Sequence, residues 1–137
     1  MRDLLEEDVP NKILKVAKID HVMWKKRLAD MMVGIVRLQP DELSSHEACR
    51  LGKWYYGPAS LPFRASAPFQ ALEAPHRLVH QHGIAAVKAY NEGDNASAME
   101  SITNLRDASD QVIELLSKLE LEVPQPAVAG AGGVVAF

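Results

Sequence analysis

The residues of this sequence with the most distinctive chemistry are its one cysteine and its five histidines. Four of them could converge on a single ion: His21, Cys49, His76 and His80. The last two are four residues apart, which on a helix places two imidazoles on one face, with about 5 to 6 Å between their β-carbons. Three imidazole nitrogens and one thiolate form a closed tetrahedral set for structural zinc, with bonds of about 2.0 to 2.3 Å. The donor types therefore indicate a zinc site.

The competing interpretation is a helical core in which the histidines are simply hydrogen-bonded. The four candidates lie 28, 27 and 4 residues apart, which is not the spacing of a zinc finger or ribbon, so one ion would have to join separate helices. Buried ring nitrogens need partners, however, and an aliphatic core offers few. Spacing alone leaves both interpretations open. Copper(I) would need more sulfur, magnesium or calcium would need oxygen, and a di-iron bundle would need a second Glu-x-x-His unit besides Glu73 to His76.

The elements that must position these side chains are helices. Apolar residues recur every three or four positions over residues 13–38, which predicts one long amphipathic helix that carries His21 on its inward face and ends before Pro40. A similar pattern predicts a helix from about residue 73 to residue 91 that carries His76 and His80, with Pro75 in its first turn. A regular seven-residue repeat predicts a further helix over residues 98–119.

The cysteine is expected on a short helix. Ser44 and Glu47 have the spacing of a capping box, which predicts a helix that starts there, carries Cys49 and fades at Gly52. The Pro-rich segment that follows, up to residue 68, reads as a loop or a set of turns.

This pattern of helices without alternating strands predicts an all-α fold, an antiparallel helical bundle. We expect residues 1–12 to be an N-terminal extension or the remnant of an upstream helix, 13–120 the bundle domain, and 121–137 a disordered, Gly- and Ala-rich tail.

Composition narrows the classes of function. The 137 residues include 15 Lys and Arg against 18 Asp and Glu, a net charge of −3, which argues against a nucleic-acid partner. No stretch is long and apolar enough to span a membrane, and the acidic start does not resemble a signal peptide. A single cysteine permits no intrachain disulfide and fits a reducing compartment. We therefore expect a cytoplasmic protein without membrane or nucleic-acid partners.

Three sequence blocks resemble the signature of a known family. Residues 19–25 (IDHVMWK), 49–55 (CRLGKWY) and 75–80 (PHRLVH) are similar, in order and spacing, to the chemoreceptor zinc-binding domain family, whose members are bacterial cytoplasmic sensor domains attached to chemoreceptors and diguanylate cyclases. The resemblance covers roughly residues 13–120. It implies a four-helix bundle with a short additional helix that carries the cysteine, usually a homodimer. It also implies zinc held by four ligands: His21, Cys49, His76 and His80.

The resemblance favours a non-enzymatic sensor that responds to zinc or to oxidants such as hypochlorous acid through Cys49. Its output would be a chemotaxis or cyclic-di-GMP signalling domain, in the same chain or in trans. The alternatives are a purely structural, zinc-stabilised bundle that acts as a protein-interaction module, and a metallohydrolase, which would need an open zinc position.

Some neighbouring residues could also contribute to the site. His46 could be a fifth ligand, although a surface position in the capping box is the simpler expectation. Asp20 and Glu73 could orient ligand imidazoles. Trp24 and Trp54 are expected as core walls that exclude water.

Overall fold

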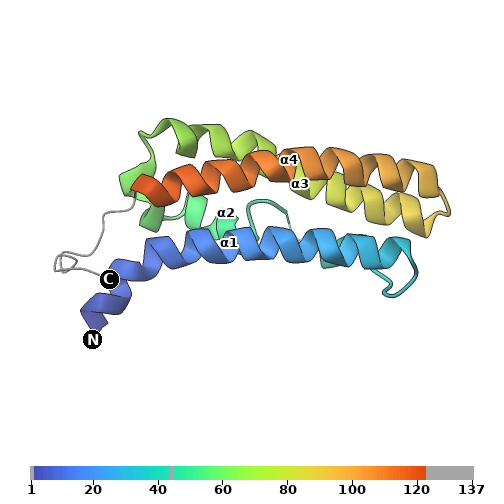
Figure 1. The fold of residues 1–137 in the computed structure, drawn as a ribbon, viewed down its shortest axis with the longest axis horizontal. Coiled ribbons are helices and arrows are strands. Elements are labelled where there is room, and N and C mark those ends of the chain that lie inside the picture. Colours follow the sequence, from blue (N-terminus) through green and yellow to red (C-terminus); the bar gives the residue numbers. More distant parts are fainter. Residues whose placement is uncertain (1, 44, 123–137) are drawn as a thin grey trace.

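The computed structural model describes residues 2–43 and 45–122, with side chains from residue 12 onward. Within this part of the chain every regular element is helical (Figure 1). The elements in chain order are α1 (Arg2–Met32), the 3₁₀ helix η1 (Pro40–Glu42), α2 (Arg50–Tyr56), the 3₁₀ helix η2 (Pro58–Phe63), α3 (Ala67–Asn91) and α4 (Asn95–Glu122). No described helix is both long and apolar enough to cross a membrane.

Helix α4 is the centre of the bundle, because it packs against both α3 and α1 and runs antiparallel to each of them (Figure 1). The short α2 lies against α1. The predicted all-α antiparallel bundle, with a short helix that presents the cysteine, is confirmed, and α2 is its fourth α-helix.

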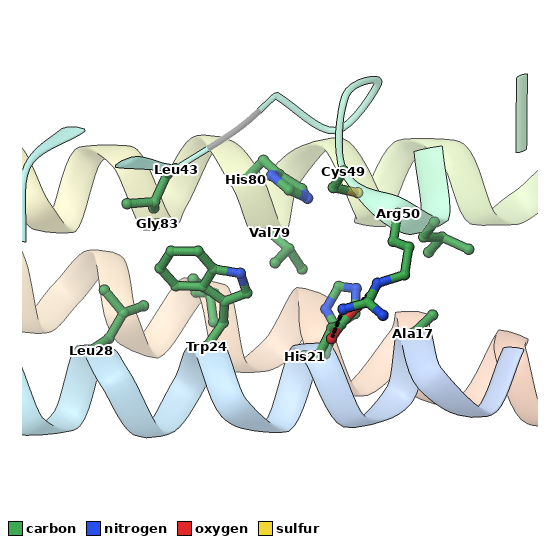
Figure 2. Close-up of a pocket in the computed structure, with 13 residues that line it drawn as sticks. Ala17, His21, Trp24, Leu28, Leu43, Cys49, Arg50, Val79, His80 and Gly83 are labelled. Atoms are coloured by element: carbon green, nitrogen blue, oxygen red, sulfur yellow. Dashed lines mark hydrogen bonds and ion pairs between the residues drawn. The ribbon is translucent and has the colours of Figure 1, made fainter. Parts of the chain in front are cut away.

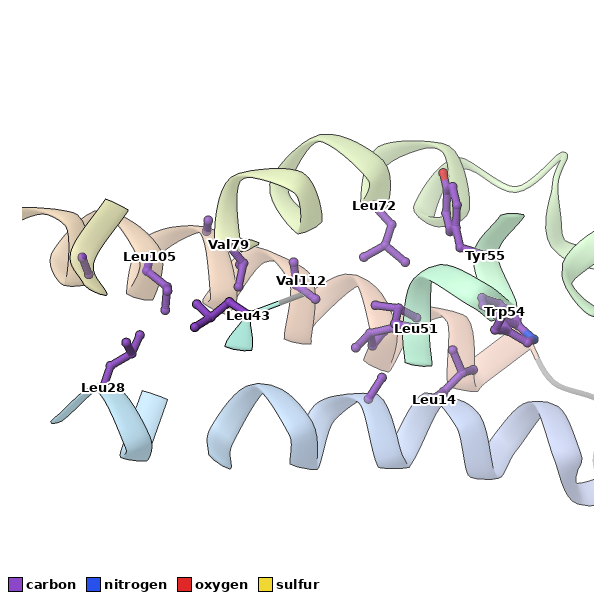
Figure 3. Packing of buried hydrophobic residues seen from close by; sticks show 14 of the residues in the cluster. Leu14, Leu28, Leu43, Leu51, Trp54, Tyr55, Leu72, Val79, Leu105 and Val112 are labelled. Atoms are coloured by element: carbon purple, nitrogen blue, oxygen red, sulfur yellow. The ribbon is translucent and has the colours of Figure 1, made fainter. Parts of the chain in front are cut away.

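The core follows the seven-residue repeat of α4. All seven inward positions of this repeat are buried: Ala98, Ile102, Leu105, Ser109, Val112, Leu116 and Leu119. Leu14 and Leu28 of α1 and Leu72 and Val79 of α3 pack into the same cluster (Figure 3). Burial of one apolar stripe per helix, rather than helix propensity alone, therefore holds the three long helices together.

The first long helix ends earlier than its apolar pattern predicts. Gly34, at φ 81°, closes α1 in the left-handed conformation, with hydrogen bonds from its N–H to Met31 O (3.0 Å) and from Ile35 N–H to Asp30 O (2.9 Å). These two bonds are those of a Schellman C-cap, for which glycine is favoured. The prediction of one helix over residues 13–38 is therefore wrong at its C-terminal end. Ile35 is 70% exposed, whereas Leu38 is buried from the extended segment that follows.

The third α-helix starts earlier than predicted. Ser66 caps it, because its Oγ accepts a hydrogen bond from Phe69 N–H at 3.2 Å, and Pro68 occupies the first turn. Pro75 therefore lies inside α3, not in its first turn, and is buried there. Packing of the Phe69 and Leu72 side chains, both nearly inaccessible, stabilises the two turns that precede this proline.

Candidate metal centre

Three of the four predicted ligands come together at one point. Donor atoms of Cys49, His76 and His80 all lie within 4.8 Å of one another. Cys49 Sγ is 3.3 Å from His76 Nε2, and His76 Nε2 is 3.2 Å from His80 Nε2. Donors that share a tetrahedral zinc ion, at bonds of about 2.0 to 2.3 Å, are roughly 3.3 to 3.6 Å apart. The two separations from His76 Nε2 are therefore close to those that such an ion requires.

The two histidines of the cluster owe their positions to α3. They are one turn apart, so both rings project from the same face, with ring centroids 4.9 Å apart and planes at 81°. His76 is 2% exposed and His80 is partly buried. The helix therefore presents two imidazole nitrogens to one point, as their spacing predicts.

Cys49 is held at the start of α2. It is the N-cap residue, with extended backbone angles, and its Sγ accepts a hydrogen bond from Gly52 N–H at 3.4 Å. The prediction that the helix starts at the capping box is wrong: residues 46–48 form a turn, α2 begins at Arg50, and it continues past Gly52 to Tyr56. Ser44 itself lies outside the described residues. As a result the sulfur points at the backbone N–H groups of α2 rather than lying along its side.

Glycine is required at position 52 by a close backbone approach. A Cβ atom there would overlap the carbonyl oxygen of His46 and lie 2.8 Å from the carbonyl carbons of His46 and Glu47. The turn before Cys49 can therefore pack directly onto α2 only because residue 52 has no side chain.

His21 approaches the cluster from α1. Its ring is buried, with its centroid 5.7 Å from that of His76. Figure 2 shows it rising from α1 toward His80 and Cys49 on the opposite wall of a pocket. It is not one of the three residues whose donor atoms all lie within 4.8 Å of each other, so its role as a ligand remains a prediction.

Burial keeps the imidazoles of His76 and His21 neutral. It lowers the pKa of His76 to about 2, with further lowering by the nearby His80, His21 and His46, and it lowers the pKa of His21 to about 4, with His80 again contributing. Burial also raises the pKa of the Cys49 thiol, against the opposing effect of the N–H groups of Gly52 and Leu51. Neutral imidazole is the form that binds a metal, whereas the thiol must lose its proton on binding.

A polar network surrounds the cluster on the side of α3. His46 Nε2 lies 3.2 Å from Glu73 Oε2, which also accepts a hydrogen bond from Tyr56 Oη at 3.1 Å, and Arg77 Nη1 donates to Glu73 Oε1 at 3.0 Å. The His46 side chain is only 15% exposed, and its ring centroid is 5.9 Å from that of His76. The expected surface position for His46 is therefore wrong. Its spacing of three residues from Cys49 was the signal that placed it near the site.

The two carboxylates considered as orienting groups have other partners in the described structure. Glu73 holds His46, as above, and Asp20 pairs with Arg50 through two contacts of 3.2 Å. The two tryptophans predicted as core walls around the site lie in different places. Trp24 lines the pocket beside His21, whereas Trp54 lies in a separate aromatic cluster with Phe63 and Phe69.

A pocket of about 250 Å³ opens beside the cluster. His21, Cys49 and His80 line its polar end, and Leu28, Leu43 and Leu105 are among the apolar residues that line the rest (Figure 2). Two members of the cluster, Cys49 and His80, are therefore reachable from a cavity instead of being sealed in the core.

Comparison with known proteins agrees with this geometry. Residues 21–87 match the family model described as the chemoreceptor zinc-binding domain. The matched range begins at His21 and includes Cys49, His76 and His80, so the resemblance of the three sequence blocks is confirmed. Comparison with curated proteins and with solved structures gave no match.

Proposed function

We propose that this chain, a member of the chemoreceptor zinc-binding domain family through residues 21–87, is a regulatory domain that binds one zinc ion. The observation that carries the proposal is the convergence of one sulfur and two imidazole nitrogens within 4.8 Å of one another, with two of the three separations close to those of a tetrahedral site. His21 is the fourth ligand in this proposal, because it is buried beside His76 and no hydrogen bond engages its ring within the described residues.

The donor set fits zinc by its chemistry as well as by its distances. Nitrogen and sulfur suit this ion, and the buried imidazoles are already in the neutral form that ligation needs. Bound zinc would hold the Cys49 sulfur as a thiolate and join α1, α2 and α3 at one point. Four protein ligands leave no position for a reactive water, so a regulatory role is favoured over a catalytic one.

Cys49 is the group we propose as the sensing element. It is partly buried and lines the pocket, which gives a small oxidant a route to its sulfur. Hypochlorous acid would transfer its oxygen to the thiolate: an S–O bond forms, the O–Cl bond breaks, chloride leaves, and the sulfur is oxidised to sulfenic acid. Because Sγ also caps α2, this change would weaken the hold of α2 on α3. Zinc itself is the other input we propose.

The output in this proposal lies in a signalling domain, of the chemotaxis or cyclic-di-GMP type, in the same chain or in a partner. A reducing cytoplasm is the setting that suits a functional lone thiol. The purely structural alternative, a zinc-stabilised bundle that acts as an interaction module, predicts that the domain unfolds when zinc is lost. A sensor must instead remain folded without metal.

A second copy of the chain is the partner we propose for one face of α1. Ile19, Val22 and Met23 are each at least half exposed and lie at helical spacing on one face, which would be covered in the homodimer that the family resemblance implies. Light scattering should then show a dimer that Val22→Glu dissociates. Leu121→Glu, at an exposed site elsewhere, should leave the dimer intact, and a monomeric wild type would refute this interface.

Elemental analysis of the purified protein tests the zinc proposal. We expect about one zinc per chain in the wild type and weaker zinc binding in Cys49→Ala. Hydrogen exchange of α2 before and after stoichiometric hypochlorous acid tests the sensing step, since oxidation should increase exchange there. A wild type free of zinc after growth in zinc-replete medium would refute the proposed site.

A further inference from the structure

Two more histidine rings, those of His21 and His46, contact His76 of the Cys49–His76–His80 cluster, so five donor side chains lie close together where a tetrahedral ion takes four. Two imidazoles that share such an ion have ring centroids roughly 5 Å apart. Measured from His76, the centroid of His80 is at 4.9 Å, that of His21 at 5.7 Å and that of His46 at 5.9 Å. The His46 ring is thus about as close to His76 as the ring of His21, the proposed fourth ligand, and one donor is in excess.

The cysteine and the extra histidine belong to the same turn. His46 and Cys49 are three residues apart, and the Cys49 thiol lies 3.6 Å from the carbonyl oxygen of His46, to which it donates. This turn lies outside the regular helices and is held by bonds from the N–H groups of Ala48 and Cys49 to Ser45 O. A rotation of this one short segment would therefore move the sulfur and the imidazole at the same time.

Glu73 contacts the His46 ring beside the ion site. Breaking this contact would cost little free energy. The Glu73 carboxylate keeps the hydrogen bonds from Tyr56 and Arg77 after the contact with His46 is broken. No buried charge would be left without a partner, which is the usual penalty for removing one member of such a network.

We propose that His46 is a reserve zinc ligand, which takes the fourth position beside His21, His76 and His80 when the Cys49 thiolate is lost by oxidation or substitution. The inference rests on the zinc site proposed above. Oxidation of Cys49 would then exchange one ligand for another and retain the metal. The turn of residues 45–49 would move relative to α3, and that movement would be the signal.

Zinc affinity, measured by competition with a chromophoric chelator, tests this proposal in four proteins: wild type, His46→Ala, Cys49→Ala and the double variant. We expect His46→Ala alone to change the affinity by less than about threefold. In the Cys49→Ala background the same substitution should weaken binding by at least about tenfold, the range typical of losing a group that supports a metal. His82→Ala in both backgrounds is the control, because His82 is on α3 but outside the cluster.

Cobalt(II) gives a second readout. We expect Cys49→Ala to keep the intense visible bands of a tetrahedral site, and the double variant to lose them, with unchanged helix content by circular dichroism. Equal affinities of Cys49→Ala and the double variant, or no binding by Cys49→Ala, would overturn the reserve role. So would a His46→Ala effect as large in the wild-type background, which would make His46 a permanent ligand. A wild type that binds no zinc would instead refute the proposed function itself.

Discussion

Replacing Gly52 by alanine should displace the turn that carries Cys49. The new Cβ would overlap the backbone carbonyl oxygen of His46, and the position of a Cβ is fixed by its own backbone, so no side-chain rotation can relieve the overlap. The turn must move away from α2. That movement breaks the hydrogen bond from residue 52 N–H to Cys49 Sγ and strains the two bonds to Ser45 O.

The size of the effect follows from these three bonds. Each contributes about 0.5 to 1.5 kcal/mol net, so the cost lies between about 0.5 kcal/mol, if only the bond to Cys49 Sγ is lost, and about 4.5 kcal/mol, if all three are lost. Alanine in place of glycine inside a helix stabilises the folded state by about 1 kcal/mol, because of its higher helix propensity. We therefore expect Gly52→Ala to lower the free energy of unfolding of the metal-free protein by up to about 3.5 kcal/mol. Zinc affinity should fall by about 10- to 100-fold, because the misplaced sulfur loses its supporting N–H group.

Gly83→Ala is the matched control. This residue is also inside a helix, but its new Cβ would meet only the side chains of Leu43 at 3.0 Å and Leu105 at 3.4 Å, which border the pocket and can move. Both variants gain the same helix propensity, but only Gly52→Ala creates an overlap with backbone. Thermal melts without metal, followed by chelator competition for zinc, therefore show the effect of the overlap alone. We expect the Gly83 variant to be at least as stable as the wild type. If Gly52→Ala matched it in both stability and zinc affinity, the close approach of the turn to α2 would be refuted.

Two further predictions concern buried polar groups. Ser109 is fully buried, and its hydroxyl has no hydrogen-bond partner within the described residues. Ser109→Ala should therefore raise the free energy of unfolding, measured by urea denaturation, by about 1 kcal/mol. A destabilised variant would contradict this. Burial holds the pKa of His21 at about 4 and that of His76 at about 2, below the ordinary 6.5, so below pH 6.5 the unfolded chain binds protons that the folded chain does not. Urea denaturation of the metal-free protein should therefore show stability that is complete above pH 6.5 and falls with acidification, by up to about 1.4 kcal/mol per pH unit for each histidine down to its folded pKa. Equal stability at pH 7 and pH 5 would refute the burial of these rings.

The sequence predicted those parts of the fold that depend on a repeated local pattern. The repeat of α4 has one inward residue per turn, apolar at every position except Ser109, and its inward positions are all buried. The pairing of His76 with His80 needs only helical spacing, and it is observed. Helix ends were harder, because an apolar stripe does not show where the backbone turns. Ile35 continues the stripe of α1, yet Gly34 ends that helix first.

The rest of the site depends on contacts between distant segments. Cys49 is an N-cap because the preceding turn packs onto Gly52, a backbone approach that no residue pattern reveals. His46 is drawn inward by Glu73, which is 27 residues away in the chain. A capping-box pattern favours a surface position for such a histidine, and tertiary contacts override it.

The most direct test of the account is the coordination shell of zinc in the wild-type protein, measured by X-ray absorption at the zinc edge. The account predicts one sulfur at about 2.3 Å and three nitrogen neighbours at about 2.0 to 2.1 Å, with the imidazole scattering pattern, and loss of the sulfur in Cys49→Ala. A shell of nitrogen and oxygen alone in the wild type would contradict it.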